Sequence, residues 1–202
     1  MIISYNPGNL SRQFRTAGEA WNFAVAYINE FGDIVTTEDA QLTKEVRNLQ
    51  LHVVDPTVGW PIPGTGWKDE KLKLYSEQFM SPENPGFDYT YGERLRRNNE
   101  VDQIVAVIKR LRESPVTRRA VMTTWHSSDL MSDLHVPCMI MDDFLMRDNK
   151  LHLTAVFRSH DIKQAWPQNV FGLYTMLKFV ANEVGTDVGS ITTFSVNAHI
   201  YL

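Results

Sequence analysis

The chain has 202 residues, a length that fits one domain. Apolar residues make up 43% of the sequence and charged residues 22%, which is the composition of a folded globular protein rather than a disordered chain. The net charge of -4 lacks the basic excess that binding along a phosphate backbone requires, so nucleic acid is not expected as the main partner.

Helical spacing of apolar residues dominates the first half of the chain. It predicts helices over residues 14–31, 72–79 and 101–111. Gly32 follows the first of these helices as a residue suited to a left-handed cap. Residues 49–54 alternate like a strand, and residues 55–67 form a Gly- and Pro-rich loop that is long enough to expect a functional role.

The pattern changes to a β period in the second half. Short β-rich runs follow at residues 121–125, 139–146, 151–157 and 191–201. Residues 147–150 predict a hairpin turn, and residues 170–184 predict a long helix with Gly185 as its stop. Because helices and strands are interspersed, the expected fold is α+β. We expect a single domain over residues 1–202, in which a mixed or antiparallel sheet packs with helices.

Cys138 is the only cysteine, so no disulfide can form within the chain, and a reducing, cytoplasmic compartment is expected. The N-terminus lacks the basic and apolar regions of a secretory signal. No run in the sequence approaches the ~18 apolar residues of a membrane span, so no membrane is expected as a partner.

Cys138 is also the first candidate for chemistry. A free cysteine is commonly a small buried hydrophobe, and this is one interpretation. The other is a nucleophile, because Arg118, Arg119 and Arg158 lie within 20 residues of it, and arginines lower the pKa of a neighbouring thiol. Two separated arginine sites also indicate a bound anion, since a guanidinium group pairs with phosphate or carboxylate through two hydrogen bonds.

Three further polar residues have both a structural and a functional interpretation. Asn169 lies near the start of the long helix, where it could cap the helix or present an amide to one edge of a planar heterocycle. His199 and Tyr201 alternate on one face of the last strand, either as half-buried polar residues or as ligand contacts. The histidines show no HxxH or HxxxH spacing, so no metal site is predicted.

A thiol hydrolase is an alternative use of the same cysteine. Cys138 would then pair with His160 or His199, with an imidazole within hydrogen-bond reach of the sulfur and an oxyanion hole nearby. A contact between the sulfur and a histidine would favour this alternative, whereas a contact with an arginine would count against it.

Five segments, taken together, resemble the thymidylate synthase family in order and spacing. They are Arg118-Arg119, Pro137-Cys138, Arg158-Ser159-His160-Asp161, Pro167-Gln168-Asn169 and His199-Ile200-Tyr201. The segment around Tyr91 is similar to the family's Tyr-Gly segment. The resemblance covers about residues 87–202, and the short chain is most similar to archaeal-type members.

The resemblance implies reductive methylation of dUMP by the co-substrate 5,10-methylenetetrahydrofolate. Cys138 would add as a thiolate to C6 of the pyrimidine, which makes C5 a nucleophile toward the folate methylene. Loss of the C5 proton and transfer of a hydride from the folate would then give dTMP and dihydrofolate.

The resemblance also implies a role for each matching residue. Arg158 and Ser159 would hold the phosphate, with Arg158 close to the thiolate. Arg118 and Arg119 would reach the phosphate bound by a second subunit, which implies a homodimer. The remaining matches are Asn169 for the N3/O4 edge of uracil, His199 and Tyr201 for the deoxyribose hydroxyl, Asp161 for the pterin and Tyr91 for the pocket wall near Cys138.

The sequence also departs from the family pattern. The family's N-terminal Arg-Thr-Gly phosphate loop is not recognisable at residues 36–39, and Phe157, Ala165 and Asn197 stand where the family has Gln, Gly and Asp. The family's catalytic glutamate has two candidates on the short helix, Glu70 and then Glu77, although either could be a solvated face residue.

These departures leave two alternatives open. The chain ends just after the His199–Tyr201 segment, where bacterial members continue into a tail that closes over folate, so we expect closure to differ. A site less well closed to water suits the family's hydroxymethylases, which act on dUMP or dCMP through the same adduct. Asn169 favours uracil, because cytosine-acting members carry Asp there. A catalytically inactive nucleotide-binding dimer is the second alternative.

Overall fold

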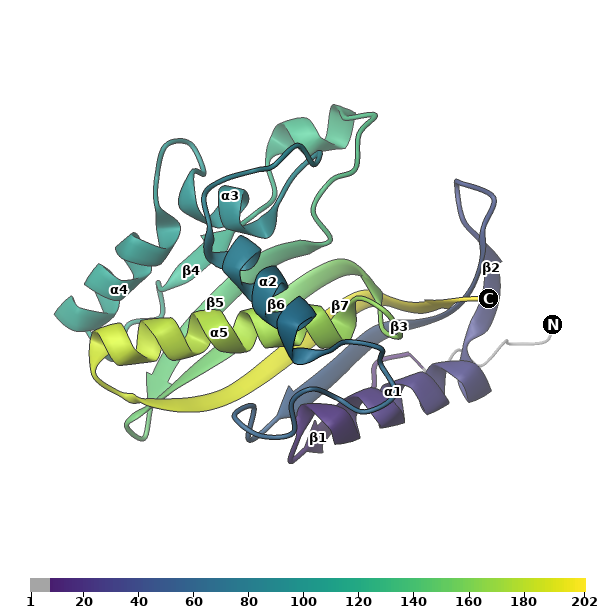
Figure 1. Ribbon diagram of the computed structural model, residues 1–202, viewed down its shortest axis with the longest axis horizontal. Helices are drawn as coiled ribbons and strands as arrows, with labels where there is room; N and C mark the ends of the chain where they lie inside the picture. Colours follow the sequence, from purple (N-terminus) through teal and green to yellow (C-terminus); the bar gives the residue numbers. More distant parts are fainter. Residues whose placement is uncertain (1–7) are drawn as a thin grey trace.

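The computed structural model describes residues 8–202, so the first seven residues of the expected domain, and most of the N-terminus considered for a signal, lie outside the described part. A seven-stranded sheet with the order β1-β3-β7-β6-β5-β4, and with β2 paired to β3, forms the centre of the fold (Figure 1). Its strands are β1 (Ser11–Phe14), β2 (Asp33–Thr36), β3 (Leu42–Val53), β4 (Val121–Thr123), β5 (Met139–Arg147), β6 (Lys150–Asp161) and β7 (Asp187–Tyr201). Its helices are α1 (Ala17–Phe31), α2 (Asp69–Met80), α3 (Tyr91–Arg96), α4 (Gln103–Glu113) and α5 (Trp166–Val184), with a 3-10 turn at Ser127–Met131.

The sheet is mixed, which confirms the α+β prediction. β5 and β6 form an antiparallel hairpin, whereas β6 and β7 are parallel neighbours. Parallel neighbours need a crossover connection, and α5 provides it. The hairpin turn lies at the predicted residues, with Asp148 and Asn149 at φ of 51° and 57°, the left-handed conformation that two-residue hairpin turns require.

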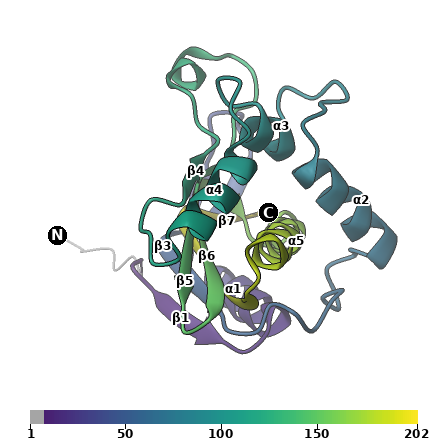
Figure 2. The same cartoon turned by 90° about the vertical axis from the view of Figure 1, so that its left-hand side faces the viewer.

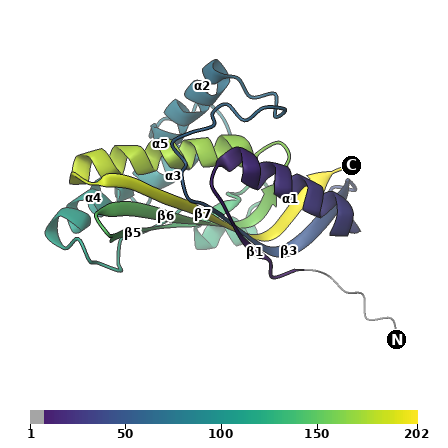
Figure 3. The ribbon, with the colours of Figure 1, turned by 90° about the horizontal axis from the view of Figure 1, so that it is seen from below.

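The helices α1, α2 and α5 lie on one side of the sheet, as two perpendicular views show (Figures 2 and 3). Strand residues alternate accordingly: Met122 and Ser195 are buried, whereas their neighbours Val121 and Val196 are 41% and 43% exposed. The opposite face of the sheet therefore presents apolar side chains to solvent in the isolated chain.

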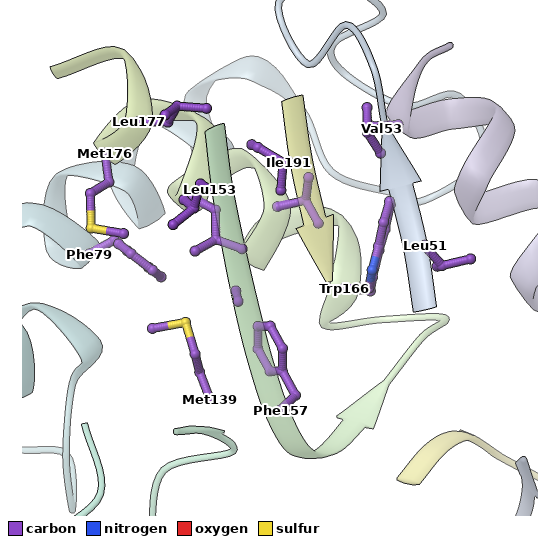
Figure 4. Packing of buried hydrophobic residues seen from close by; sticks show 14 of the residues in the cluster. Leu51, Val53, Phe79, Met139, Leu153, Phe157, Trp166, Met176, Leu177 and Ile191 are labelled. Carbon is purple, nitrogen blue, oxygen red and sulfur yellow. The ribbon is translucent and has the colours of Figure 1, made fainter. Parts of the chain in front are cut away.

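The core fills the space between α5 and the sheet. Figure 4 shows part of it, where Leu153 and Ile191 from the strands gather with Leu177 from α5. α2 packs on the outer side of α5 through Gly172, because a Cβ added there would lie 2.7 Å from the Phe79 ring. This close approach places α2 beside the amino end of α5.

The first helix ends at Phe31 as predicted, but its start and the conformation of Gly32 differ from the prediction. α1 begins at Ala17 rather than residue 14, because Phe14 belongs to β1 and Thr16 caps the helix by accepting from the N–H of Glu19. Gly32 is not a left-handed cap, since its φ is -70°. Glycine fits there because a Cβ would lie 2.5 Å from the carbonyl oxygen of Ile28.

The other helix predictions are confirmed with shifted ends. α5 begins at Trp166, four residues before the predicted start, and Pro167 occupies its first turn. It ends at Gly185, whose φ of 82° is left-handed as a C-terminal stop requires. The sequence interpretation missed α3 and the short edge strands β1 and β2. None of the helices in residues 8–202 combines the length and apolar character needed to cross a membrane.

Candidate active site

A cavity of about 430 Å³ opens between α2, the start of α5 and the ends of β6 and β7. This volume lies within the range of small-molecule binding sites. It brings together seven of the predicted site residues, which are far apart in the sequence: Tyr91, Cys138, Ser159, Asp161, Asn169, His199 and Tyr201. The other nine lining residues were not predicted as site residues of the nucleotide or the folate.

Cys138 directly precedes β5 and is tied to β6. Its carbonyl oxygen accepts a hydrogen bond from the N–H of Arg158 at 2.8 Å. The Arg158 side chain donates to the carbonyl oxygens of Pro137 (2.9 Å) and Val136 (3.1 Å), and its Nη2 lies 4.0 Å from Sγ of Cys138. The guanidinium also lies 5.7 Å from the centre of the Trp125 ring. Arg158 thus fixes the segment that carries the thiol and places a positive charge beside it.

Burial raises the pKa of the Cys138 thiol, and this effect outweighs two opposing ones. The positive charge of Arg158 and a hydrogen bond from Tyr89 both lower the thiol pKa. The predicted effect of arginine on the thiol therefore has the right sign, but the net direction is upward. Tyr89 was missed by the sequence interpretation, because nothing in its local sequence indicates a contact with sulfur.

Tyr75, Tyr89 and Tyr91 form a phenol cluster on one wall of the cavity. The Tyr91 hydroxyl accepts from the N–H of Met139 at 3.1 Å, and its ring meets the Tyr89 ring edge-on at 5.6 Å. Burial raises the pKa of Tyr75, Tyr89 and Tyr91. All three therefore remain neutral hydroxyl groups at neutral pH, able to donate or accept a hydrogen bond.

Asn169 lies inside the first turn of α5, where its N–H donates to Ala165 at 3.0 Å. Its side chain does not cap the helix. Instead, Oδ1 accepts from the Tyr75 hydroxyl at 2.5 Å, and Nδ2 lies 3.2 Å from Nε2 of His160. Asn169 is 4% exposed but lines the cavity, so its amide is held among polar partners rather than left in solvent.

His199 and Tyr201 line the cavity from the end of β7. His199 is 7% exposed, and its Nδ1 lies 3.2 Å from Oδ1 of Asn197, whose amide donates to Glu45 at 2.6 Å. Burial lowers the pKa of His199, while the carboxylates of Asp161 and Glu45 act in the opposite direction. The Tyr201 ring meets the His199 ring edge-on at 5.1 Å.

The geometry counts against a thiol hydrolase. His160 makes its contacts with Asn169 and Ser195, and His199 with Asn197. Within residues 8–202, neither imidazole forms a hydrogen bond with the Cys138 sulfur, whereas Arg158 does so at 4.0 Å. An arginine beside the thiol was the contact expected to count against this alternative.

The family model of thymidylate synthase matches residues 35–202 of this chain. The chain belongs to the thymidylate synthase family. It is 42% identical over 189 residues to "Putative thymidylate synthase" of Methanosarcina barkeri, covering 93% of this chain and 87% of that protein. It is 40% identical to the protein of the same name from Methanothermobacter thermautotrophicus, over 91% of this chain and 89% of the relative.

The fold of a solved thymidylate synthase is also similar. The crystal structure of thymidylate synthase from T4 phage superposes with a TM-score of 0.73 and covers 90% of this chain and 76% of that one. Sequence identity is 21%, so this likeness concerns the fold.

The two glutamates expected to supply the family's catalytic carboxylate lie away from the cavity. α2 lines it with Tyr75, Gln78 and Phe79, which share one helical face. At 100° per residue, Glu70 and Glu77 fall on the opposite face, and both are exposed. The structure therefore gives no support to a catalytic role for Glu70. Asp161 is the one carboxylate among the described lining residues of this thymidylate synthase-family site.

Arg118 and Arg119 also lie outside the cavity lining. Both are exposed on the segment between α4 and β4. Neither arginine therefore shares the cavity lining with Cys138 in the described chain.

Proposed function

We propose that this thymidylate synthase-family protein methylates dUMP to dTMP with 5,10-methylenetetrahydrofolate, through a covalent bond between Cys138 and C6. The observation that carries the proposal is a cavity lined by a thiol and a buried amide, with the guanidinium of Arg158, which is not among the lining residues, 4.0 Å from the sulfur. A nucleophile, a cation and a group that both donates and accepts match the pyrimidine ring and phosphate of one nucleotide.

The reaction divides among the residues as follows. Sγ of Cys138 bonds to C6, and the electron pair of the C5=C6 bond moves toward C5 and O4. Asn169 holds the N3/O4 edge, so its amide faces the oxygen where negative charge develops. The folate methylene bonds to C5, and loss of the C5 proton then releases the folate nitrogen and leaves an exocyclic methylene group on C5. Hydride transfer from the folate to that methylene group makes the methyl group, re-forms the C5=C6 bond and expels the Cys138 thiolate, and the folate leaves as dihydrofolate.

The phosphate would be held by Ser159 and Arg158. Two nitrogens of Arg158 are used on the segment before Cys138, while Nη1 has no hydrogen bond to any residue in 8–202, so its N–H groups are available to an anion. His199 and Tyr201 would hold the deoxyribose. Asp161 would contact the pterin, since one of its oxygens accepts from the N–H groups of residues 163 and 164 and leaves the other for a ligand.

The proposed function includes a homodimer, and the position of the arginines is compatible with it. Arg118 and Arg119 are exposed outside their own cavity, and the sheet face without helices carries exposed apolar residues such as Val121 and Val196. Pairing two such faces would bury apolar area and bring the arginines of one subunit to the phosphate of the other. Sedimentation equilibrium tests this arrangement: a dimer is expected, and a monomer at micromolar concentration would contradict it.

Hydroxymethylation of dUMP or dCMP is the second candidate. Tyr201 lines the cavity and is 41% exposed, so water reaches the site in this state. Water could then capture the methylene group before the hydride does. A nucleotide-binding dimer without catalysis is the third, because no carboxylate from α2 is present in the described lining.

One experiment separates these functions. The protein is incubated with dUMP and 5,10-methylenetetrahydrofolate while dihydrofolate absorbance and product mass are followed together. A methylated product with dihydrofolate supports the proposal, and a hydroxymethylated product without dihydrofolate supports the second candidate. Tight dUMP binding without release of tritium from C5-labelled dUMP would indicate the inactive dimer. The reduced thiol that the reaction requires is consistent with a cytoplasmic protein.

A further inference from the structure

Four side chains form a hydrogen-bonded chain from the cavity into the sheet. Tyr75 of α2 contacts Oδ1 of Asn169 at 2.5 Å, and Nδ2 of Asn169 contacts Nε2 of His160 at 3.2 Å. Nδ1 of His160 then contacts the hydroxyl of Ser195 at 3.0 Å. Asn169, His160 and Ser195 are 4%, 1% and 1% exposed, so this relay is almost free of solvent.

His160 is a neutral imidazole in this relay. Burial is the main cause of the lowering of its pKa well below the usual value, with the nearby His199 contributing in the same direction. The ring also stacks on Phe157 with the centroids 3.7 Å apart. A neutral imidazole has one N–H donor and one acceptor nitrogen, so each contact along the relay has a defined direction.

The relay can run in two directions. In the first, Tyr75 donates to Oδ1 of Asn169, Nδ2 donates to Nε2 of His160, and Nδ1–H of His160 donates to Ser195. In the second, every donor and acceptor is exchanged, and the amide of Asn169 is turned over. The first direction is the one in which the amide lies in this structure.

The direction of the relay matters because of how pyrimidines differ. Uracil presents an N3–H donor and an O4 acceptor, whereas cytosine presents an N3 acceptor and an N4 amino donor. An amide that turns over freely could serve either base. An amide held at both ends by buried partners serves one of them and leaves the other with unpaired polar groups, which is how a site rejects an analogue.

We propose that Tyr75 and His160, supported by Ser195, hold the Asn169 amide in the orientation that selects uracil over cytosine. They are positioning residues, because they act on the nucleotide through Asn169. This inference rests on the proposed function, in which Asn169 meets the N3/O4 edge. It adds Tyr75 of α2 as a determinant of base preference, although Tyr75 lies 94 positions from Asn169 in the sequence.

The test measures dissociation constants for dUMP and dCMP by titration calorimetry in Tyr75→Phe, Asn169→Ala and the double variant. Tyr75→Phe removes the donor to Oδ1 and is expected to lower the preference for dUMP about tenfold, the size of one buried hydrogen bond. In the Asn169→Ala background, Tyr75→Phe should not change the preference further. Tyr89→Phe is the matched control, since it removes a hydroxyl from the same cavity wall without touching the relay.

Several results would overturn the inference. An unchanged preference in Tyr75→Phe, an equal weakening of both nucleotides, or a further change in the Asn169→Ala background would each show that Tyr75 does not act through the amide. If Tyr75→Phe fails to fold, Ser195→Ala decides instead, with a smaller loss of the same preference expected and no change contradicting the relay. The wild-type protein gives an independent readout, because ¹⁵N NMR should show the proton of His160 on Nδ1, and a proton on Nε2 would contradict the assigned direction.

The outcomes separate this inference from the proposed function. Failure of the wild-type protein to bind dUMP would overturn both. Normal binding and preference for dUMP in the wild type, retained in Tyr75→Phe, would overturn the relay alone.

Discussion

Replacement of Arg158 by glutamine should make the Cys138 thiol less acidic. Nη2 of Arg158 lies 4.0 Å from Sγ, and the arginine lowers the thiol pKa against the effect of burial. Two unit charges at this distance attract by about 1 kcal/mol in water and about 4 kcal/mol at an effective dielectric constant of about 20. Because the Arg158 residue is exposed, the lower end of about 1 kcal/mol applies, which is about a fivefold change in an equilibrium constant. Loss of the charge should therefore disfavour the thiolate by about this factor and raise the thiol pKa.

The assay is the pH dependence of alkylation by iodoacetamide. Only the thiolate reacts, and Cys138 is the sole cysteine, so the rate reports this one group. Loss of the positive charge disfavours the thiolate, so the midpoint of the rate profile should move to higher pH in Arg158→Gln. Arg158→Lys, which keeps a charge but loses the paired contacts to residues 136 and 137, should recover part of the shift.

Arg110→Gln provides the matched control, because Arg110 is an exposed arginine of α4 outside the cavity lining. Its profile should match that of the wild type. An unchanged or lowered midpoint in Arg158→Gln would refute the reasoning, since it would mean that the charge of Arg158 does not act on the sulfur.

Two further predictions concern the amide and the packing of α2. Asn169→Asp should shift the preference from dUMP toward dCMP in steady-state assays, because a carboxyl group changes the donor and acceptor pattern facing the base; an unchanged preference would remove its proposed role. Gly172→Ala should lower the free energy of unfolding by about 1–3 kcal/mol in urea denaturation, because the new Cβ would lie 2.7 Å from the Phe79 ring. Gly18→Ala in α1 is its control, with the nearest atom 3.8 Å away, and should be neutral or stabilising; equal effects of the two changes would contradict this account of the packing.

The sequence predicts the parts of this protein that depend on local pattern. The long helix ending at Gly185 and the turn at Asp148 and Asn149 follow from helical periodicity and turn chemistry, and both are confirmed. The prediction of a left-handed cap at Gly32 was wrong. A glycine after a helix can be required because a Cβ would clash with a neighbouring atom, here the carbonyl oxygen of Ile28, as well as by a left-handed φ. A pattern in one segment does not distinguish these two causes.

Parts of the candidate site could likewise be predicted from the sequence, and other parts could not. The resemblance to the thymidylate synthase family implies that Cys138, Asn169 and His199 share one site, and the structure brings them together in one cavity. The placement of Glu70 fails for a reason that the sequence does contain, because the apolar stripe of α2 already indicates which face packs inward. Neither the sulfur contact of Tyr89 nor the partners of His160 has a local signal, because they arise where distant segments meet.

The net effect of burial on the thiol also lies beyond the sequence. Neighbouring arginines suggest an acidic thiol, but the pKa is raised because the surroundings of Cys138 exclude water. The Cys138 thiol beside Arg158 and Tyr89 is thus protonated at neutral pH, and the proposed attack on C6 requires nucleotide binding to favour the thiolate.

The covalent bond between Cys138 and C6 is the central claim, and trapping that bond tests it most directly. With 5-fluoro-dUMP and 5,10-methylenetetrahydrofolate, the fluorine at C5 cannot leave as the proton does, so the adduct cannot proceed to product. Intact-protein mass spectrometry under denaturing conditions should show a mass increase equal to the nucleotide plus the folate. Peptide mapping should place it on Cys138, and Cys138→Ala should bind the nucleotide without forming it. An unmodified Cys138 in wild-type protein that binds the nucleotide, or an adduct on another residue, would contradict the account.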